Sequence, residues 1–194
     1  KTGLTVAPTL LLEFHGTDQG VKEQAEIVQE IALDSGGSNF QWTTNAEERN
    51  RLWQARHDAA YACKALRPGG EIWATDVCVP ISRLAECIRE TQQDIRDFGL
   101  FAPIVGHVGD GNFHLCLLVG KDDPAESKKA NELHERMVMR ALGMGGTCTG
   151  EHGVGYGKLD FLVAEHGEAI SVMRSIKQAL DPDNIMNPGK VLRV

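Results

Sequence analysis

Apolar side chains recur every three to four residues along several stretches of the chain, the spacing that gives a helix one buried face. The clearest case lies in 124–142, where Leu133, Met137 and Ala141 share one side. Asn45 is a good N-cap for the helix that follows it, and Ser82 is expected to cap another. The predicted helices cover 18–34, 45–65, 82–98, 124–142, 158–166 and 168–180.

Short apolar runs bounded by turn residues predict strands between these helices. The predicted strands cover 8–15, 39–43, 72–79, 103–108 and 113–119. Helices alternate with strands as far as a hairpin made by the last two strands. The predicted fold class is therefore α+β, a ferredoxin-like and mainly antiparallel sheet with helices on one face. In this prediction 1–157 form the main domain, and 158–194 form C-terminal helices and a tail.

Composition and charge exclude some functions. The chain has 194 residues, of which 42% are apolar and 24% charged, with a net charge of −7. That charge argues against nucleic acid or an anionic membrane as the main partner, because binding phosphate groups needs a basic face. No apolar stretch approaches the ~20 residues that cross a bilayer. The five cysteines have no Cys-x-x-Cys spacing, so we expect reduced, buried thiols in an intracellular, cytoplasmic compartment.

Several candidate functional residues lie close together around a predicted hairpin turn. Asp110-Gly111, flanked by alternating apolar residues, predicts a two-residue turn. Folding about this pair would put His107 directly opposite His114, with β-carbons about 4.5–5.5 Å apart on one side of the sheet. Two imidazoles that close are natural metal ligands, whereas a lone strand histidine is more often a hydrogen-bonded structural residue.

A third candidate ligand, Glu151, lies in the Gly-rich segment 145–157. Two histidines and one carboxylate, with one position left open, are a common catalytic metal site and suit Zn²⁺, Mn²⁺ or Fe²⁺. His152 would then lie beside the open position, as a general base or as a group that orients Glu151. The segment fits neither phosphate-loop pattern, so its glycines are expected to let the backbone approach a ligand or another domain closely.

Arg56 lies among apolar residues on its predicted helix. A guanidinium in such surroundings needs a carboxylate partner, which is either a protein group or a substrate. The sequence pattern leaves both options open.

Several motifs together resemble the C-terminal domain of FAD-linked oxidases, in the same order and at similar spacing. The motifs are Gly106-His107-Val108-Gly109-Asp110-Gly111-Asn112-Phe113-His114, Thr149-Gly150-Glu151-His152-Gly153-Val154-Gly155, Asp181-Pro182 and Met186-Asn187-Pro188-Gly189-Lys190. Within that family, two further segments are most similar to the flavin-dependent, cytochrome-linked D-lactate dehydrogenases and to glycolate-oxidase-like subunits. These segments are Trp53-Gln54-Ala55-Arg56-His57 and Thr75-Asp76-Val77-Cys78-Val79-Pro80.

The resemblance implies a flavoprotein that oxidises a small D-2-hydroxy acid to the 2-oxo acid with FAD as the acceptor. It implies that His107, His114 and Glu151 are ligands of a divalent metal, Zn or Mn. It further implies that His152 is the catalytic base and that Arg56 contacts the substrate carboxylate.

The resemblance also implies a partner domain. Asn187 and Lys190 correspond to cofactor-binding residues near the interface with an FAD-binding domain, on which 158–194 would pack. The chain begins at Lys1 without an initiator Met, so we expect a piece of a longer protein. On this view FAD is held mainly by the missing N-terminal domain.

Two positions depart from relatives that act on D-2-hydroxyglutarate. Those relatives often have Asn where Cys116 stands, and a Lys near the position of Thr75. The loss of these polar groups removes contacts for a second carboxylate, so a monocarboxylic substrate such as D-lactate or glycolate is favoured.

Two alternatives to a flavoprotein remain at this point: a self-sufficient metallohydrolase that uses the same site, and a non-catalytic α+β module whose histidines are structural. The sequence does not identify the electron acceptor. It leaves the oligomeric state open, with a homodimer as one option. A mitochondrial location is expected if the source is eukaryotic.

Overall fold

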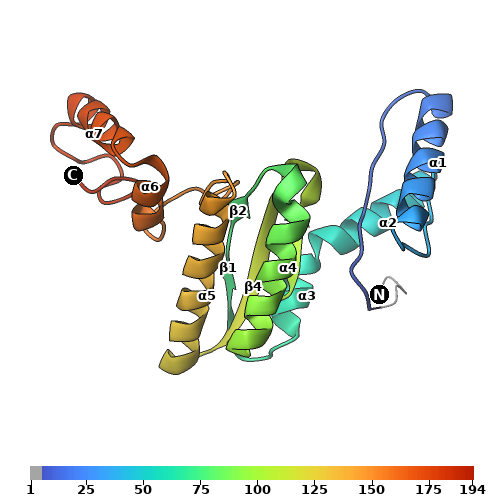
Figure 1. Cartoon of the computed structure of the whole chain (residues 1–194), viewed down its shortest axis with the longest axis horizontal. Coiled ribbons are helices and arrows are strands. Elements are labelled where there is room, and N and C mark those ends of the chain that lie inside the picture. Colours follow the sequence, from blue (N-terminus) through green and yellow to red (C-terminus); the bar gives the residue numbers. More distant parts are fainter. Residues whose placement is uncertain (1–5) are drawn as a thin grey trace. The chain divides into compact units, whose positions relative to one another are not determined.

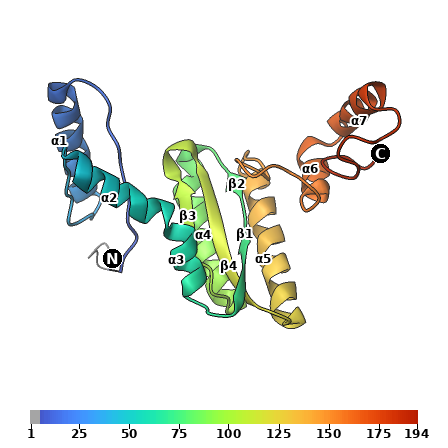
Figure 2. The same cartoon turned by 180° about the vertical axis from the view of Figure 1, so that it is seen from behind.

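The computed structural model describes residues 6–194, shown from opposite sides in Figures 1 and 2. Its backbone contacts divide the chain into two compact units, Lys1–Ala60 and Tyr61–Val194. The domain boundary predicted at 157/158 lies inside the second unit and stays a prediction. No helix within 6–194 combines the length and the apolar character needed to cross a bilayer.

The regular secondary structure of the first unit is α-helical. α1 (Asp18–Asp34) begins after Thr17, whose hydroxyl oxygen accepts a hydrogen bond from the backbone of the first turn. α2 (Ala46–His57) begins after Asn45, whose side-chain oxygen accepts two such bonds. These caps satisfy amide groups that a helix leaves unpaired at its start. The predicted bounds of α1 and the predicted Asn45 cap are confirmed.

Two predicted strands in this unit are wrong. Residues 8–15 and 39–43 pair with no strand within residues 6–194, and Leu10 and Leu12 are exposed. An apolar run becomes a strand only where another strand can pair with it. The helix predicted over 45–65 is interrupted at Asp58, a weak helix former whose carboxylate accepts a bond from Gln54, and continues as α3 (Ala59–Ala65).

The second unit contains an antiparallel sheet, in agreement with the predicted α+β class. Its strands are β1 (Gly70–Ala74), β2 (Val77–Cys78), β3 (Ile104–His107) and β4 (Asn112–Gly120). β4 is central, with β3 on one side and β1 followed by β2 on the other. Thr147 adds a single antiparallel bridge to Cys78. With this bridge counted as a last, minimal strand, the order is the β-α-β-β-α-β of ferredoxin-like units.

One face of β4 builds the core. Phe113, Leu115, Leu117 and Val119 point to the helices that cover this face in Figure 1, α4 (Ile81–Phe98) and α5 (Pro124–Gly143). These helices contribute buried apolar side chains, namely Leu84, Cys87, Ala130, Leu133, Met137, Val138 and Ala141. α4 starts at Ile81 after Pro80, so the cap predicted at Ser82 is wrong.

The other face of β4 carries His114, Cys116 and Leu118, all buried. The thiol of Cys116 hydrogen-bonds with that of Cys63 on α3, and burial raises its pKa to about 12. All five cysteines are free thiols, and only Cys78 is partly exposed, which agrees with the predicted reduced state.

Charged groups join α4 to α5. Asp94 is buried between Arg136 and Arg140, and Arg140 also pairs with Glu90 (Nε–Oε2, 2.7 Å). A buried carboxylate is tolerated here because two guanidinium groups compensate its charge.

Beyond α5 the chain forms α6 (Leu159–His166), α7 (Ala169–Leu180) and an irregular tail. Arg193 pairs with Asp160 on α6 (2.5 Å), and Val191 N–H donates to the carbonyl of Gly155 (2.9 Å). The tail is therefore fixed to the segment that precedes α6.

His134 on α5 gives a testable pH dependence. Its ring meets Phe161 edge-on, and its Nε2 is buried without a hydrogen-bond partner among the described residues. Burial, with a smaller effect of the Lys158 ammonium, lowers the pKa of His134 to about 4. The unfolded chain takes up this proton near pH 6.5, so the free energy of unfolding falls as the pH drops from 6.5 to about 4.

We expect His134→Leu to flatten the thermal stability profile over that interval, by up to about 3 kcal/mol at its acid end. Calorimetry from pH 7 to pH 4 measures this effect. His15→Leu, which alters an exposed histidine, should leave the profile unchanged. Equal profiles for the unsubstituted chain and His134→Leu would contradict the burial argument.

Candidate functional site

The hairpin that carries the two histidines differs from its prediction. A one-turn 3-10 helix, η1 (Val108–Asp110), and Gly111 replace the two-residue turn, and His107 pairs with Asn112 rather than with His114. Gly111 has a left-handed backbone (φ +77°), and its carbonyl accepts a bond from Val79 N–H (3.0 Å). This contact with Val79, directly after β2, fixes the conformation of the loop. It could not be predicted from the residues around the turn, because Val79 lies far from Gly111 in the sequence.

Even so, both histidines lie on the predicted side of the sheet. His114 pairs with Val105, two residues before His107, so the actual register differs from the predicted one by two. Side chains alternate with a period of two, and a shift of two keeps every residue on its face. The ring centroids of His107 and His114 are 6.5 Å apart. The predicted direct opposition is wrong, whereas the predicted proximity is confirmed.

The strand beside His114 is interrupted at Thr75 and Asp76, between β1 and β2. The register of β1 continues in β2, but Leu115 N–H donates to the Thr75 hydroxyl (2.8 Å) instead of to its carbonyl. The freed carbonyl of Thr75 lies 2.8 Å from Nδ1 of His114. A carbonyl can only accept, so Nδ1 carries the proton and the ring orientation is fixed.

Nε2 of His114 consequently points at Glu151, with Oε1 at 2.8 Å. If Nδ1 holds the only ring proton, a lone pair faces a carboxylate oxygen, and a positive charge is needed between them: a proton or a metal ion. This geometry fits a cation site, because an imidazole held by a carbonyl at its other nitrogen is the usual arrangement of a metal-binding histidine.

Two more histidines surround the same oxygen. Nε2 of His107 and Nε2 of His152 each lie 3.8 Å from Oε1 of Glu151. The rings of His114 and His152 are stacked, with centroids 4.7 Å apart. Ligand atoms of His114, Glu151 and His152 lie within 4.8 Å of one another, close enough to hold one metal ion. The four residues predicted from the two motifs thus form one cluster, called here the histidine–carboxylate cluster.

A buried acid and a buried base lie behind this cluster, and neither was predicted as a site residue. Asp76 is fully buried, and its carboxylate accepts hydrogen bonds from the Asn112 side chain and from the Thr149 hydroxyl (2.8 and 2.7 Å). Burial raises the pKa of Asp76, but the hydrogen bonds, led by the His152 amide, outweigh burial and hold it far below its usual range. Lys158 reaches the same place from the start of α6, and burial lowers its pKa.

The sequence contains a signal for Asp76 that could have been used. It is a lone charged residue inside the apolar run 72–79, and a charge there must find partners when the strand is buried. Lys158, at the edge of a helix, has no comparable signal.

Residues 3–191 match the model of the family described as FAD linked oxidases, C-terminal domain. The chain belongs to this family. Membership supports the flavoprotein prediction over the hydrolase and the non-catalytic module.

The relatives include a probable mitochondrial D-lactate dehydrogenase from Danio rerio, 52% identical over 97% of the chain and 38% of the relative. A mitochondrial D-lactate dehydrogenase [cytochrome] from Arabidopsis thaliana is 46% identical over 97% of the chain and 34% of the relative. The glycolate oxidase subunit GlcD from Escherichia coli is 30% identical over 93% of the chain and 36% of the subunit. The chain therefore spans between a third and two fifths of these relatives.

A solved structure shares the fold. It is a 4-ethylphenol oxidase from Gulosibacter chungangensis in an isoeugenol complex, with a TM-score of 0.66 over 92% of the chain and 38% of that protein. Its sequence is only 19% identical, so the likeness concerns the fold alone.

The remaining predicted site residues of this FAD-linked oxidase domain are not among the four residues of the cluster. Arg56 is half-buried on α2 and belongs to the first unit, whereas the cluster belongs to the second. Asn187 and Lys190 contact each other (3.3 Å), and the Lys190 ammonium lies 5.5 Å from the Tyr156 ring centroid. The roles predicted for these three residues stay predictions.

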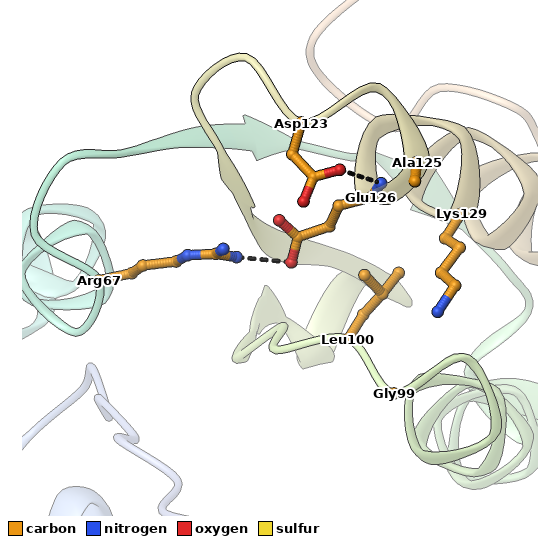
Figure 3. A pocket seen from close by; sticks show the side chains of 7 residues that line it. All are labelled: Arg67, Gly99, Leu100, Asp123, Ala125, Glu126 and Lys129. Atoms are coloured by element: carbon orange, nitrogen blue, oxygen red, sulfur yellow. Dashed lines mark hydrogen bonds and ion pairs between the residues drawn. The ribbon is translucent and has the colours of Figure 1, made fainter.

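A surface pocket lies at the opposite end of β4 from the cluster (Figure 3). Arg67 pairs there with Glu126 (2.6 Å), and Asp123 caps α5 through the Glu126 amide (2.9 Å). Arg67 also donates to the carbonyl of Leu118 (2.7 Å). These groups satisfy one another and join the end of β4 to α5, so the pocket has a structural explanation.

The Thr75 hydroxyl yields a prediction. Thr75→Val keeps the shape of the side chain but removes the acceptor for Leu115 N–H, and an unpaired buried donor costs about 1–3 kcal/mol. We expect that loss in denaturant unfolding, with faster hydrogen exchange at the Leu115 amide. The Leu117 amide serves as an internal control, and equal protection of both amides in the variant would contradict the bonding described.

Proposed function

We propose that this chain is the substrate-binding part of a flavoprotein dehydrogenase that oxidises a small D-2-hydroxy acid, of the D-lactate or glycolate type, to the 2-oxo acid. The observation that carries the proposal is the histidine–carboxylate cluster, in which Oε1 of Glu151 lies within 3.8 Å of three imidazole nitrogens. The names of the D-lactate dehydrogenase and glycolate oxidase relatives support the substrate class.

His107, His114 and Glu151 are the groups that would hold a divalent ion, Zn or Mn. Imidazole and carboxylate donors suit both metals. When bound, the ion supplies Lewis-acid stabilisation of negative charge on the substrate oxygens, and FAD supplies the two-electron acceptor.

His152 is proposed as the base that accepts the proton of the substrate hydroxyl. Its ring is half-exposed, stacked on His114, and therefore both oriented and reachable. A neutral imidazole in hydrogen-bond reach of a hydroxyl is a suitable general base. Arg56 is proposed to bind the substrate carboxylate, for which a planar guanidinium offers two parallel donors.

The substrate is proposed to be a monocarboxylate. Cys116 is buried against Cys63, and the Thr75 hydroxyl is occupied by Leu115 N–H. Neither position offers a free polar group to a second carboxylate, and a charged group without a partner is strongly disfavoured.

FAD is proposed to bind mainly to a further domain of the full-length protein, with 158–194 packed against that domain and Asn187 and Lys190 near the cofactor. A mitochondrial location is proposed for a eukaryotic source, after the mitochondrial relatives.

The decisive test separates ligand from base with three variants of the full-length protein, His107→Ala, His114→Ala and His152→Ala. Loss of a ligand should weaken Mn²⁺ binding at least tenfold, whereas loss of the base should leave Mn²⁺ binding within about threefold and lower kcat by 10²–10⁴. Titration calorimetry with Mn²⁺ and turnover of D-lactate with an artificial electron acceptor measure the two effects.

His166→Ala, a histidine of α6 outside the cluster, is the matched control and should change neither quantity. If His152→Ala weakens Mn²⁺ binding as strongly as His114→Ala, His152 is a ligand and the assignment of the base is wrong. Full activity of all three variants would refute the proposed function.

A separate prediction concerns the 194-residue chain by itself. We expect it to purify without stoichiometric flavin and to oxidise no D-2-hydroxy acid, because the proposed FAD site lies mainly in another domain. The absorbance spectrum of the purified chain measures the first part, and stoichiometric yellow flavin would contradict it.

A further inference from the structure

We infer that Asp76 is the positioning residue of the histidine–carboxylate cluster, with Lys158 as its counter-ion. The inference rests on the proposed function, since it assigns a role in building that same site. It goes beyond the proposed ligands, base and substrate contact, because Asp76 has none of these roles.

Asp76 holds the loop that carries Glu151 and His152. The amides of these two residues donate to the same oxygen of Asp76, Oδ2, at 3.1 and 2.9 Å, and the Thr149 hydroxyl joins them at 2.7 Å. Successive backbone N–H groups converging on one anion fix the backbone conformation between them. The directions in which the Glu151 and His152 side chains leave the loop follow from that conformation.

The backbone of this loop passes very close to Asp76 and Asn112. A Cβ at position 150 would overlap the Asn112 side-chain nitrogen and meet Oδ1 of Asp76 at 3.1 Å. Gly150 therefore allows the backbone to approach a buried carboxylate of the protein itself. Asn112 binds the other oxygen of Asp76 (2.8 Å) and thereby connects β4 to the same group.

Lys158 compensates the negative charge of Asp76. A fully buried carboxylate needs a compensating cation, and Lys158 is the ammonium that reaches it, with Nζ 3.4 Å from Oδ2. The same Nζ donates to the carbonyls of Asp76 (2.9 Å) and Cys148 (2.8 Å). Lys158 thus joins the strand break to both ends of the Gly-rich loop.

Asp76 acts through other residues rather than on a substrate. It is fully buried, and its oxygens are already occupied by donors from the protein. Its Oδ1 lies 3.7 Å from Nδ1 of His114, too far for a hydrogen bond, and that nitrogen donates to the Thr75 carbonyl.

The test compares Asp76→Ala with Asp94→Ala in the 194-residue chain. Both variants remove a buried carboxylate that has cationic partners, but Asp94 lies between α4 and α5. For Asp76→Ala we expect hydrogen exchange at the Glu151 and His152 amides to accelerate at least tenfold, and Mn²⁺ affinity to fall 10–100-fold. Asp94→Ala should change neither. Amide exchange followed by NMR without metal, and Mn²⁺ titration, measure the two effects.

Asp76→Asn keeps one oxygen in place and should lie between the unsubstituted chain and Asp76→Ala in both measurements. If Asp76→Ala does not fold, Asp76→Asn decides, with exchange at both amides expected to be several-fold faster. Unchanged exchange in the folded Asp76 variants overturns the inference. If the unsubstituted chain binds no Mn²⁺, amide exchange alone decides the role of Asp76, and the metal part of the proposed function is decided by the titration of the full-length protein.

Discussion

A carboxylate buried without solvent is costly unless charge and hydrogen bonds compensate it, and Asp76 meets that requirement with donors from several separate segments. Asn112 belongs to β4, Thr149 and His152 to the Gly-rich loop, and Lys158 to the start of α6. These donors converge because the Asp76 carboxylate needs hydrogen bonds from all of them. The break in the strand, the path of the loop and the place where α6 begins are thus consequences of a single buried charge.

The two faces of β4 have different roles because its side chains alternate: one face builds the core, and the other carries a residue of the cluster. Phe113, Leu115 and Leu117 fill the core under α4 and α5, whereas His114 faces the other way into the cluster. The strand can therefore be rigid because one face is densely packed, and that rigidity is passed to the histidine on the opposite face. The Thr75 hydroxyl completes this arrangement, since it frees a backbone carbonyl to orient the ring without leaving Leu115 N–H unpaired.

The sequence predicts local features well and long-range ones poorly. Helix α1 and the Asn45 cap depend on contacts within a few residues, and both were predicted correctly. The stretches 8–15 and 39–43 have strand-like composition, but a strand exists only with a partner, which composition does not reveal.

The same limit applies to the candidate site. Its residue types were predictable because two histidines and one carboxylate are a common set of metal ligands. The hairpin register depends on the bond between Val79 and Gly111, and the importance of Asp76 depends on a loop more than seventy residues away. Neither contact can be derived from local pattern, although a lone aspartate in an apolar strand was a sign that partners had to exist.

The alternation of side chains also limits how this hairpin can change over evolutionary time. His107 and His114 stay on one face of the sheet if the number of residues between them stays even, whatever the type of turn. Removing one residue from the connection would turn His107 toward the helix-covered side, whereas removing two would leave it beside its partner. Natural length variation at this connection should therefore occur in steps of two. The lengths of insertions and deletions would then show that both imidazoles must lie on the same face of the sheet.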